Sequence, residues 1–379
     1  MKILVDAIPM TGLLTGIARY LRNMYSAMAA MNNVEISYLT GKKLVDDMPF
    51  LADSRKWQKA TAAVWNLPDP VVFGLRSVHW LRYEKLLRGI CRKNSFDIYH
   101  ETAFVPAKLT AVPTIYSIYD LSLRRFRSTH PRERVWFFEY FLKNRMQFVS
   151  HILTISEFIR QEIIEEFSIP PEMVTSIPLA PDPVFGLKSA AEVKKVKEKY
   201  RLPESYLLFV SSLEPRKNID LLINAMQAVS VDVPLVLVGW QGWGDKEWLE
   251  KIKSAGLKDR IYITGHISDN DLTAIYNGAL ALVYPSIYEG FGLPIVEAMA
   301  CGCPVICSNA ASMPEAAGDA AILIDPARSD ELAAAIETII HDQEYRNQLV
   351  KLGQKQAEKF SWYRTAGETL ELFKMVVGK

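Results

Sequence analysis

Short apolar segments alternate with longer amphipathic segments along most of this chain of 379 residues. Such alternation is typical of parallel β-sheets whose strands are joined by helices lying on both faces. We expect strands at 2–7, 34–39, 98–100, 112–118, 152–155, 174–177, 206–210, 235–238, 260–264, 281–284 and 305–307. We expect helices near 16–31, 80–93, 131–148, 157–167, 219–229, 329–341, 344–357 and 363–377. The chain is therefore predicted to be an α/β protein with doubly wound parallel sheets.

A proline-rich segment divides this pattern into two series. Residues 178–183 hold three prolines in six positions, which is a linker signal. A chain of 379 residues also exceeds the length that one hydrophobic core usually serves. We predict a first domain at 1–180, a second at 181–361, and a final helix within 362–379.

Composition narrows the functional class. Hydrophobic residues make up 49% of the chain and charged residues 23%, as in globular enzymes, and the net charge of +1 does not favour nucleic-acid binding. No apolar run reaches the roughly 18 residues of a membrane-spanning helix, and the first residues are expected to be a strand, not a signal peptide. The four cysteines match no common zinc spacing, so we expect a reduced, cytoplasmic protein without a bound metal.

Two carboxylates stand eight positions apart in the segment from Tyr284 to Glu297. The first, Glu289, precedes the turn Gly290-Phe291-Gly292, and Leu293-Pro294 is expected to open a helix that carries Glu297. The unpaired N–H groups in the first turn of a helix form a natural anion site. Carboxylates on either side of a bound phosphate can reach hydroxyl groups on either side of it. This layout suits a sugar joined through a diphosphate to a nucleoside.

Two adjacent cations follow an apolar strand in the second series. The loop from Ser211 to Asn218 contains Ser212, Arg216 and Lys217. Arg binds phosphate in a bidentate manner and Lys supplies a compact charge, so the pair can neutralise a leaving diphosphate without a metal. Asn218 and Asp220 are expected to cap the next helix.

These two motifs resemble retaining GT-B glycosyltransferases, in particular glycosyltransferase family 4. The first resembles the Glu-x7-Glu signature of that family, and the likeness continues through residues 298–309 and 313–318 to Asp325-Pro326. The loop at 211–218 is similar to the family's Glu-Pro-x-Lys-Asn loop. The resemblance implies two Rossmann-like domains that face an interdomain cleft, with the final helix packed back on the first domain. It implies transfer of a hexose from a nucleotide sugar to a hydroxyl group with retention of anomeric configuration.

The resemblance also implies a role for each motif residue. Glu289 would hold the 3- or 4-hydroxyl of the sugar, and Glu297 would bind the ribose. Arg216, Lys217 and the amides at 291–293 would stabilise the departing diphosphate oxygen. The leaving phosphate itself would deprotonate the acceptor, so that no protein general base is required.

Other site residues are expected in the loops after further strands. Segment 11–20 resembles the family's N-domain glycine loop, and its Gly16 would allow a ligand close to the backbone, although Ala18 replaces the second glycine. Asp120 ends a strand where relatives carry His-Asp, with Tyr119 here in the His position; it would orient the acceptor or the donor sugar, or cap a turn. His100 and Glu101 end the preceding strand and are weaker candidates.

The loop at 265–272 resembles the family's Gly-x-Val-Ser-Asp-x-x-Leu loop. Its backbone near His266 and Ile267 would contact the nucleobase of the donor. Asp269 or Asn270 is expected to cap the following helix. Asp269 and Asp271 also have the D-x-D form used by metal-dependent glycosyltransferases of another fold, but their place before a helix favours capping.

Residues 76–145 are strongly basic within a nearly neutral chain. They hold fourteen Lys or Arg against six Asp or Glu, a difference of +8, and aromatic residues are interleaved with them. Such a face suits an anionic membrane surface or a lipid-diphosphate acceptor, and it equally suits a solvated helix face whose apolar side lies in the core.

The opening residues 1–12 and the block 308–315 look most like mannosyltransferases of O-antigen or capsule assembly that use GDP-mannose. A UDP-sugar donor is the alternative, because backbone contacts read the base. The acceptor is expected to be a saccharide, free or linked to a polyprenyl diphosphate. Two other functions remain open: a nucleotide-sugar 2-epimerase of the same fold and a non-catalytic sugar-nucleotide-binding scaffold.

Overall fold

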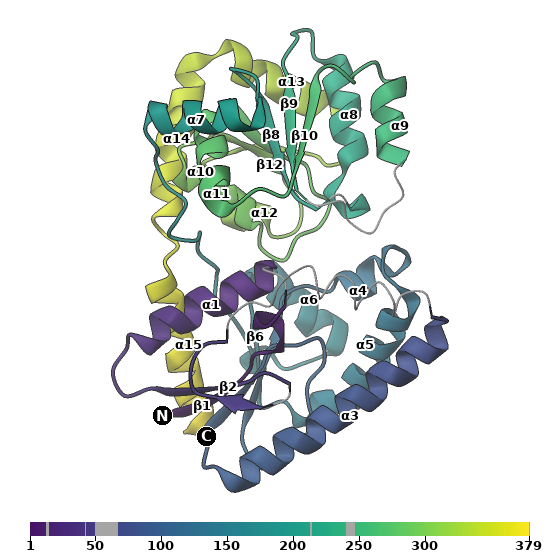
Figure 1. Ribbon diagram of the computed structural model, residues 1–379, viewed down its shortest axis with the longest axis vertical. Helices are drawn as coiled ribbons and strands as arrows, with labels where there is room; N and C mark the ends of the chain where they lie inside the picture. The colour runs from purple at the N-terminus through teal and green to yellow at the C-terminus, as the bar shows by residue number, and fades with distance from the viewer. Residues whose placement is uncertain (13–14, 42, 50–66, 213, 240–246, 379) are drawn as a thin grey trace. The chain divides into compact units, whose positions relative to one another are not determined.

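The computed structural model describes residues 1–12, 15–41, 43–49, 67–212, 214–239 and 247–378 (Figure 1). These form two compact units. The first comprises residues 1–179 together with 362–379, and the second comprises residues 180–361.

The first unit is built on a sheet with the strand order β3-β2-β1-β4-β5-β6-β7. All described neighbours in it are parallel except β3, which runs antiparallel to β2. The strands are β1 (Lys2–Asp6), β2 (Glu35–Leu39), β3 (Leu44–Val45), β4 (Ile98–Glu101), β5 (Thr114–Ile118), β6 (His151–Thr154) and β7 (Val174–Ser176). Every residue of β4, β5 and β6 is buried, as expected for central strands covered on both faces.

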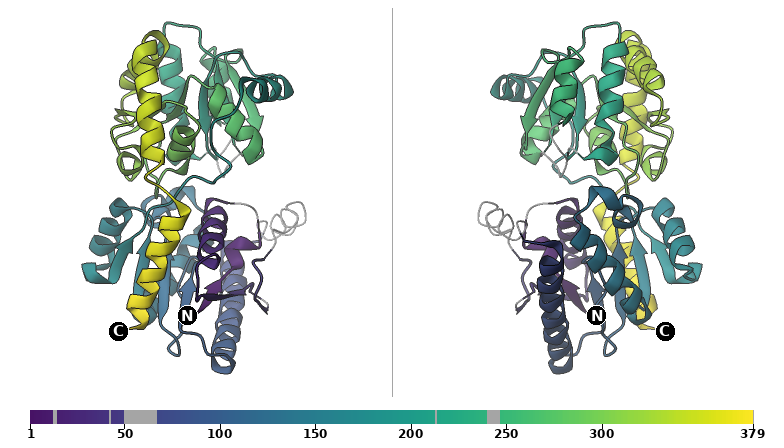
Figure 2. Two further views of the ribbon diagram at one scale, coloured as in Figure 1. Left: turned by 90° about the vertical axis from the view of Figure 1, so that its left-hand side faces the viewer. Right: turned by 90° about the vertical axis from the view of Figure 1, so that its right-hand side faces the viewer.

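The helices of the first unit cover this sheet. They are α1 (Gly16–Ala29), α3 (Asp69–Lys93), α4 (Ser122–Arg125), α5 (Arg132–Arg145), α6 (Glu157–Phe167) and α15 (Trp362–Val377), with short 3-10 turns at Ile8–Met10, Arg127–Thr129, Met146–Phe148 and Pro171–Met173. The last helix, α15, lies beside α1 (Figure 2). Its Trp362 contacts Tyr20 with ring centroids 6.0 Å apart, and its Phe373 meets the ring of His100 edge-on at 5.5 Å.

The second unit contains a fully parallel sheet in the order β10-β9-β8-β11-β12-β13. Its strands are β8 (Leu207–Val210), β9 (Leu235–Val238), β10 (Ile261–Gly265), β11 (Ala281–Tyr284), β12 (Val305–Ser308) and β13 (Ile322–Ile324). Its helices are α7 (Ala190–Tyr200), the 3-10 turn η5 (Pro215–Lys217), α8 (Ile219–Ala228), α9 (Glu247–Ser254), α10 (Asp269–Gly278), α11 (Leu293–Ala300), α12 (Met313–Ala317), α13 (Ser329–His341) and α14 (Gln343–Ala357).

Each sheet has a point where the chain changes direction across the strand order. In the first unit this point lies between β1 and β4, and in the second it lies between β8 and β11. Open α/β sheets bind ligands outside the carboxyl ends of the strands at such a point. The loops that follow β8 and β11 contain the two motifs singled out in the sequence.

The structure corrects some expected elements. Helix α3 begins at Asp69, not at residue 80 as expected. Apolar side chains on its first half lie on both a buried and an exposed face, so the sequence shows no single hydrophobic stripe there. Helix α7 was not expected, since it buries only Val196 among charged neighbours. Among the described residues, no helix is long and apolar enough to cross a bilayer.

Candidate active site

The loops after β8 and β11 are joined by hydrogen bonds at the carboxyl edge of the second sheet. The backbone N–H of Ile287 donates to the carbonyl of Arg216 at 2.8 Å. The side-chain amide of Asn218 donates to the carbonyls of Pro285 at 3.1 Å and Pro326 at 2.7 Å. Asn218 is the N-cap residue of α8, as expected, but its side chain makes no capping hydrogen bond and instead ties three loops together.

Glu289 lies between the two cations of the β8 loop. Its Oε1 is 2.5 Å from Nζ of Lys217, and its Oε2 is 3.1 Å from a guanidinium nitrogen of Arg216. The hydroxyl of Tyr284, at the end of β11, also donates to Oε1 at 2.7 Å. Glu289 is 7% exposed and Lys217 is 5% exposed, so this is an ion pair at the boundary of the core.

Burial and charge act in opposite directions on this carboxylate. Burial alone raises the pKa of Glu289, but the fields of Lys217 and Arg216 outweigh it and lower that pKa to about 2. Burial lowers the pKa of Lys217, and the field of Glu289 counteracts that shift. The carboxylate is therefore ionised at neutral pH and ready to accept hydrogen bonds from hydroxyl groups.

A second carboxylate balances the cluster. Glu214 accepts from the guanidinium of Arg216 at 3.0 Å, and its other oxygen accepts from the hydroxyl of Ser212 at 2.8 Å. Arg216 thus stands between Glu214 and Glu289. With Lys217, the four groups carry two positive and two negative charges, which the sequence motif alone did not indicate.

The glycine turn and the start of α11 have the geometry of an anion site. Gly292 has φ +99, and a Cβ there would lie 3.0 Å from the side chain of Ile295, so glycine is required. Pro294 occupies the first turn of α11, as expected. No hydrogen bond between described residues engages the backbone N–H groups of Phe291, Gly292 and Leu293. The carbonyl of Glu289, next to this turn, accepts from Ser312 at 2.8 Å.

Glu297 lies deeper than the sequence suggested. It is 2% exposed on α11, and its Oε2 accepts from the hydroxyl of Tyr276, on α10, at 3.3 Å. Tyr276 itself is fully buried. A carboxylate accepts several hydrogen bonds, so the bond from Tyr276 is compatible with a further bond from a ribose hydroxyl group.

The loop after β10 presents an exposed His266 and a buried Ile267. Ser268, one residue before the expected caps Asp269 and Asn270, is the N-cap of α10, because its hydroxyl accepts from the N–H of Asp271 at 3.3 Å. Asp271 in turn binds Lys199 at 2.6 Å and Tyr200 at 2.8 Å. Its carboxylate is therefore already engaged by side chains of α7.

The remaining predicted residues lie in the first unit. Gly16 is the first residue of α1, and among the described residues no atom beyond its chain neighbours and its own helix backbone lies within 4 Å of the position its Cβ would take. Asp120 accepts from the N–H of Ser122 at 2.9 Å at the start of α4, which is a turn-capping contact. The ring of Tyr119 meets Tyr20 edge-on at 5.8 Å.

A buried acidic pair, Asp6 and Glu101, lies where β1 and β4 end side by side; Glu101 was a weak candidate, and its pairing with Asp6 was not predicted. Both are fully buried; Tyr83 donates to Asp6 at 3.0 Å and Tyr99 donates to Glu101 at 3.0 Å. Burial raises the pKa of Asp6 to about 6 and that of Glu101 well above its usual range. Acids at the ends of neighbouring strands were the only available signal.

His100 lies inside the core of the first unit. Its ring nitrogens are 2.5 Å from the hydroxyl of Tyr25 and 2.7 Å from that of Ser117, and burial lowers its pKa to about 3. The imidazole is therefore neutral and structural, since α15 packs on it through Phe373.

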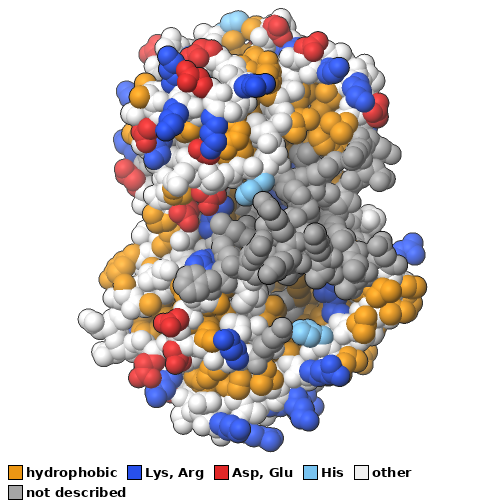
Figure 3. Space-filling view, viewed as in Figure 1, with side chains coloured by type: hydrophobic (Ala, Val, Ile, Leu, Met, Phe, Trp, Pro, Cys, Tyr) orange, Lys and Arg blue, Asp and Glu red, His pale blue; other side chains and the backbone are white. Residues whose placement is uncertain are grey.

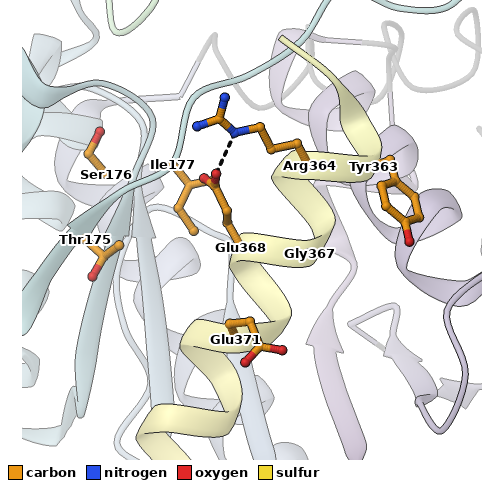
Figure 4. A pocket seen from close by; sticks show the side chains of 8 residues that line it. All are labelled: Thr175, Ser176, Ile177, Tyr363, Arg364, Gly367, Glu368 and Glu371. Carbon is orange, nitrogen blue, oxygen red and sulfur yellow. Dashed lines mark hydrogen bonds and ion pairs between the residues drawn. The ribbon is translucent and has the colours of Figure 1, made fainter. Parts of the chain in front are cut away.

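A cavity of about 610 Å³ lies between β7 and α15, and none of the predicted site residues lines it (Figure 4). The described residues contain no group of three or more His, Cys, Asp or Glu that could hold a metal ion. All four cysteines are buried free thiols whose pKa values are raised by burial.

Two family comparisons cover almost the whole chain. Residues 191–356 match the family described as "Glycosyl transferases group 1", and residues 14–184 match "Glycosyltransferase Family 4". Each match falls largely within one of the two units.

Individual relatives agree with this assignment. The chain is 33% identical to "O-antigen chain mannosyltransferase B" of Escherichia coli, over 99% of this chain and 100% of the relative. It is 27% identical to "MMP alpha-(1->4)-mannosyltransferase" of Mycolicibacterium hassiacum, over 82% of this chain and 76% of the relative. Among solved structures, Anabaena HepE in complex with UDP and glucose superposes with a TM-score of 0.74 at 19% identity, over 99% of this chain and 100% of that one.

These matches confirm the family and the GT-B fold expected from the sequence. The chain belongs to the group 1, family 4 glycosyltransferases.

Proposed function

We propose that this enzyme moves mannose from GDP-mannose to a hydroxyl group of a saccharide, with retention of anomeric configuration, in surface polysaccharide assembly. The observation that carries the proposal is the ionised Glu289 held by Lys217 and Arg216 beside a helix start with unengaged amides. The mannose donor is favoured because the relatives of 33% and 27% identity are named mannosyltransferases.

The diphosphate of the donor would bind at the start of α11. The N–H groups of Phe291, Gly292 and Leu293 lie at the start of α11, where the helix dipole favours an anion. Arg216 would turn from its two carboxylates towards the phosphate, while Lys217 would supply a positive charge from its buried position beside Glu289. These groups would stabilise the negative charge that develops on the leaving oxygen.

Glu289 would then bind the sugar of the donor. Its ionised carboxylate accepts hydrogen bonds from the 3- or 4-hydroxyl and favours the positive charge of an oxocarbenium-like state. The leaving phosphate would remove the acceptor proton, so no protein base is needed. Asp120 would orient the acceptor or the donor sugar with the carboxylate oxygen that does not cap Ser122.

The order of the strands supports the placement of the nucleoside. From β11 the sheet continues through β8 and β9 to β10, and neighbouring strands lie about 4.8 Å apart. The loops after β11, β8 and β10 therefore line one edge over a length suited to a nucleotide sugar. Glu297 would bind the ribose, and the backbone at His266 and Ile267 would contact the base.

The transfer would need no metal, because Arg216, Lys217 and the helix amides supply the positive charge that a divalent ion supplies elsewhere. We also propose that the enzyme is cytoplasmic and that its acceptor is carried on a polyprenyl diphosphate. The basic region 76–145 would contact the inner face of the membrane.

The test is product formation with purified enzyme, GDP-mannose or UDP-glucose, and a panel of mannose-containing acceptors, followed by NMR of the new anomeric proton. Transfer of α-mannose from GDP-α-mannose, unaffected by EDTA, is expected. A β-linked product would refute retention. An epimerised nucleotide sugar formed without acceptor would identify an epimerase, and nucleotide binding without any product would favour the scaffold.

A further inference from the structure

We propose that α3 and α5 together form the surface that enters the interfacial layer of an anionic membrane. We define the α3–α5 surface by the exposed apolar side chains of the two helices. Its members are Val71, Leu75, Val78 and Leu81 of α3 with Trp136 and Tyr140 of α5.

The exposure of these side chains is unusual for large apolar residues. Leu75 is 54% exposed, Val78 is 49% and Tyr140 is 60%. Single exposed apolar residues are ordinary, but clusters on adjoining elements mark interaction surfaces. Helices α3 and α5 pack against each other, and the rings of Phe73 and Tyr140 meet edge-on at 6.3 Å.

One face of α3 is apolar over its first half and basic over its second half. Positions 71, 75, 78, 82, 85 and 92 follow helical spacing, so their side chains lie on one face. The first three are Val, Leu and Val, and the last three are Arg82, Lys85 and Arg92, all exposed. Figure 3 shows apolar side chains gathered at one end of α3 and basic side chains along the rest of it.

Three of the four acidic residues on α3 and α5 are paired with arginines. Glu84 is buried and pairs with Arg145 at 2.7 Å, and Glu133 is buried and pairs with Arg76 at 3.1 Å. Glu139 pairs with Arg127. The fourth, Asp69, is half-buried at the start of α3, as Glu139 is on α5, so the exposed charged side chains of both helices are cations.

This surface differs from the one that the sequence suggested. Most aromatic residues of region 76–145 lie in the core: Trp80, Tyr83, Phe137, Phe138 and Phe141. The exposed apolar surface instead includes aliphatic residues, and it begins before residue 76. The packing of α3 and α5 therefore determines which side chains are exposed for docking, and the number of aromatic residues in the sequence does not.

The chemistry of the surface fits a lipid layer better than a protein. Trp and Tyr place an apolar ring with a polar tip, which suits the level of the headgroups. Arg and Lys along the same face attract anionic headgroups, and their alkyl stems can lie on the apolar layer. A helix with apolar and basic side chains on one exposed face is the usual form of an interfacial anchor.

This inference rests on the proposed membrane contact and specifies its residues. The test uses the full-length protein without donor or acceptor, so failure of vesicle binding and failure of transfer are separate results. Co-sedimentation is measured with vesicles of phosphatidylcholine alone and of phosphatidylcholine with phosphatidylglycerol. Binding to the anionic vesicles that falls as salt is raised is expected.

Two double variants separate the apolar and basic halves. Leu75→Ser with Val78→Ser, and Arg82→Glu with Lys85→Glu, should each weaken binding to anionic vesicles at least tenfold. The matched controls are Met375→Ser with Val377→Ser on α15, and Lys194→Glu with Lys195→Glu on α7, which are exposed as well. These controls should bind as the unchanged protein does, and transfer to a water-soluble acceptor should be unaffected in all four.

A second readout addresses Trp136 directly. Lipids brominated near the headgroup should quench part of the tryptophan fluorescence, and Trp136→Phe should remove that part. Equal losses in test and control variants, or equal binding to neutral vesicles, would overturn the proposal. So would a concentration-dependent dimer that only Leu75→Ser with Val78→Ser abolishes, since the surface would then lie between two copies of the chain.

Discussion

Glu289 and Lys217 form a buried ion pair, with 2.5 Å between Oε1 and Nζ, although 72 positions separate them in the chain. The pairing follows from strand order, because β8 and β11 are neighbours and the loops after them meet at one edge of the sheet. Burying both charges is costly unless hydrogen bonds satisfy them, and Arg216 and Tyr284 complete that set for Glu289.

Glu289→Gln should abolish transfer and leave nucleotide binding within a fewfold of the unchanged protein. The amide keeps the shape but lacks the charge that favours a positively charged sugar. Radiolabelled product and calorimetric nucleotide affinity are the measurements. Glu204→Gln, at a fully exposed carboxylate of the same unit, is the control and should retain activity. Normal turnover of Glu289→Gln would remove this residue from the mechanism.

Glu289→Ala should also unfold more easily. Lys217 would remain buried without its carboxylate, which typically costs about 3–5 kcal/mol. The free energy of unfolding in urea measures this effect. A double variant that also carries Lys217→Met should recover much of the loss; no recovery would mean that the ion pair is not the cause.

Arg216→Ala with Lys217→Ala should weaken binding of a nucleoside diphosphate by about 2–4 kcal/mol, the scale of two charge-assisted contacts. Calorimetric titration with GDP gives the affinity directly. Lys194→Ala with Lys195→Ala, on the exposed face of α7, controls for lost charge elsewhere in the unit. Unchanged GDP affinity in the site variant would place the diphosphate somewhere else.

Glu214→Gln should tighten GDP binding severalfold. Glu214 holds one side of Arg216 at 3.0 Å, and removing its charge leaves the cluster with a net positive charge for the diphosphate. The effect should shrink as salt is raised. Weaker binding would show instead that Glu214 is needed to orient Arg216.

The βα alternation and both motif loops were predictable because each depends on residues close in sequence. The pairing of Glu289 with Lys217 was not, since it depends on which strands are neighbours in the sheet. Asn218 is the N-cap residue of α8, as predicted, but its side chain makes no capping hydrogen bond; the cap predicted at Asp269 or Asn270 was wrong. Asn218 turns its amide to the carbonyls of two other loops, and Ser268 places its hydroxyl one residue earlier.

The start of α3 could not be found for a different reason. Val71, Leu75 and Val78 are apolar yet exposed, so hydrophobicity does not mark one buried side of the helix. The same side chains form the proposed membrane surface. The buried pair of Asp6 and Glu101 was also missed, because only the tertiary fold brings the ends of β1 and β4 together.

That acidic pair predicts a pH dependence of stability. Burial raises the pKa of Asp6 from 3.8 to about 6, so the native state holds a proton that the unfolded chain releases. The free energy of unfolding contributed by Asp6 therefore falls as pH rises from about 4 to about 6. His100 acts in the opposite sense, since its pKa is lowered to about 3 and it gains a proton on unfolding.

Asp6→Asn removes the titrating group of Asp6 together with the field that raises the pKa of Glu101, and both changes act in the same direction. The variant should gain stability relative to the unchanged protein as pH rises from 4 to 7, by an amount on the order of 2–3 kcal/mol. Urea unfolding at pH 4, 5, 6 and 7 measures the difference, and pH-independent effects of the substitution cancel. A difference that stays constant over this range would contradict the raised pKa.

The measurement that tests the account most directly is calorimetric titration of the enzyme with GDP, GDP-mannose, UDP and ADP, each with and without EDTA. The account predicts binding selective for GDP and GDP-mannose, unchanged by EDTA and lost in Arg216→Ala with Lys217→Ala. Selective binding of UDP would contradict the mannose donor. Binding that requires a divalent ion would contradict the metal-free site, and the absence of binding to every nucleotide would contradict the central claim.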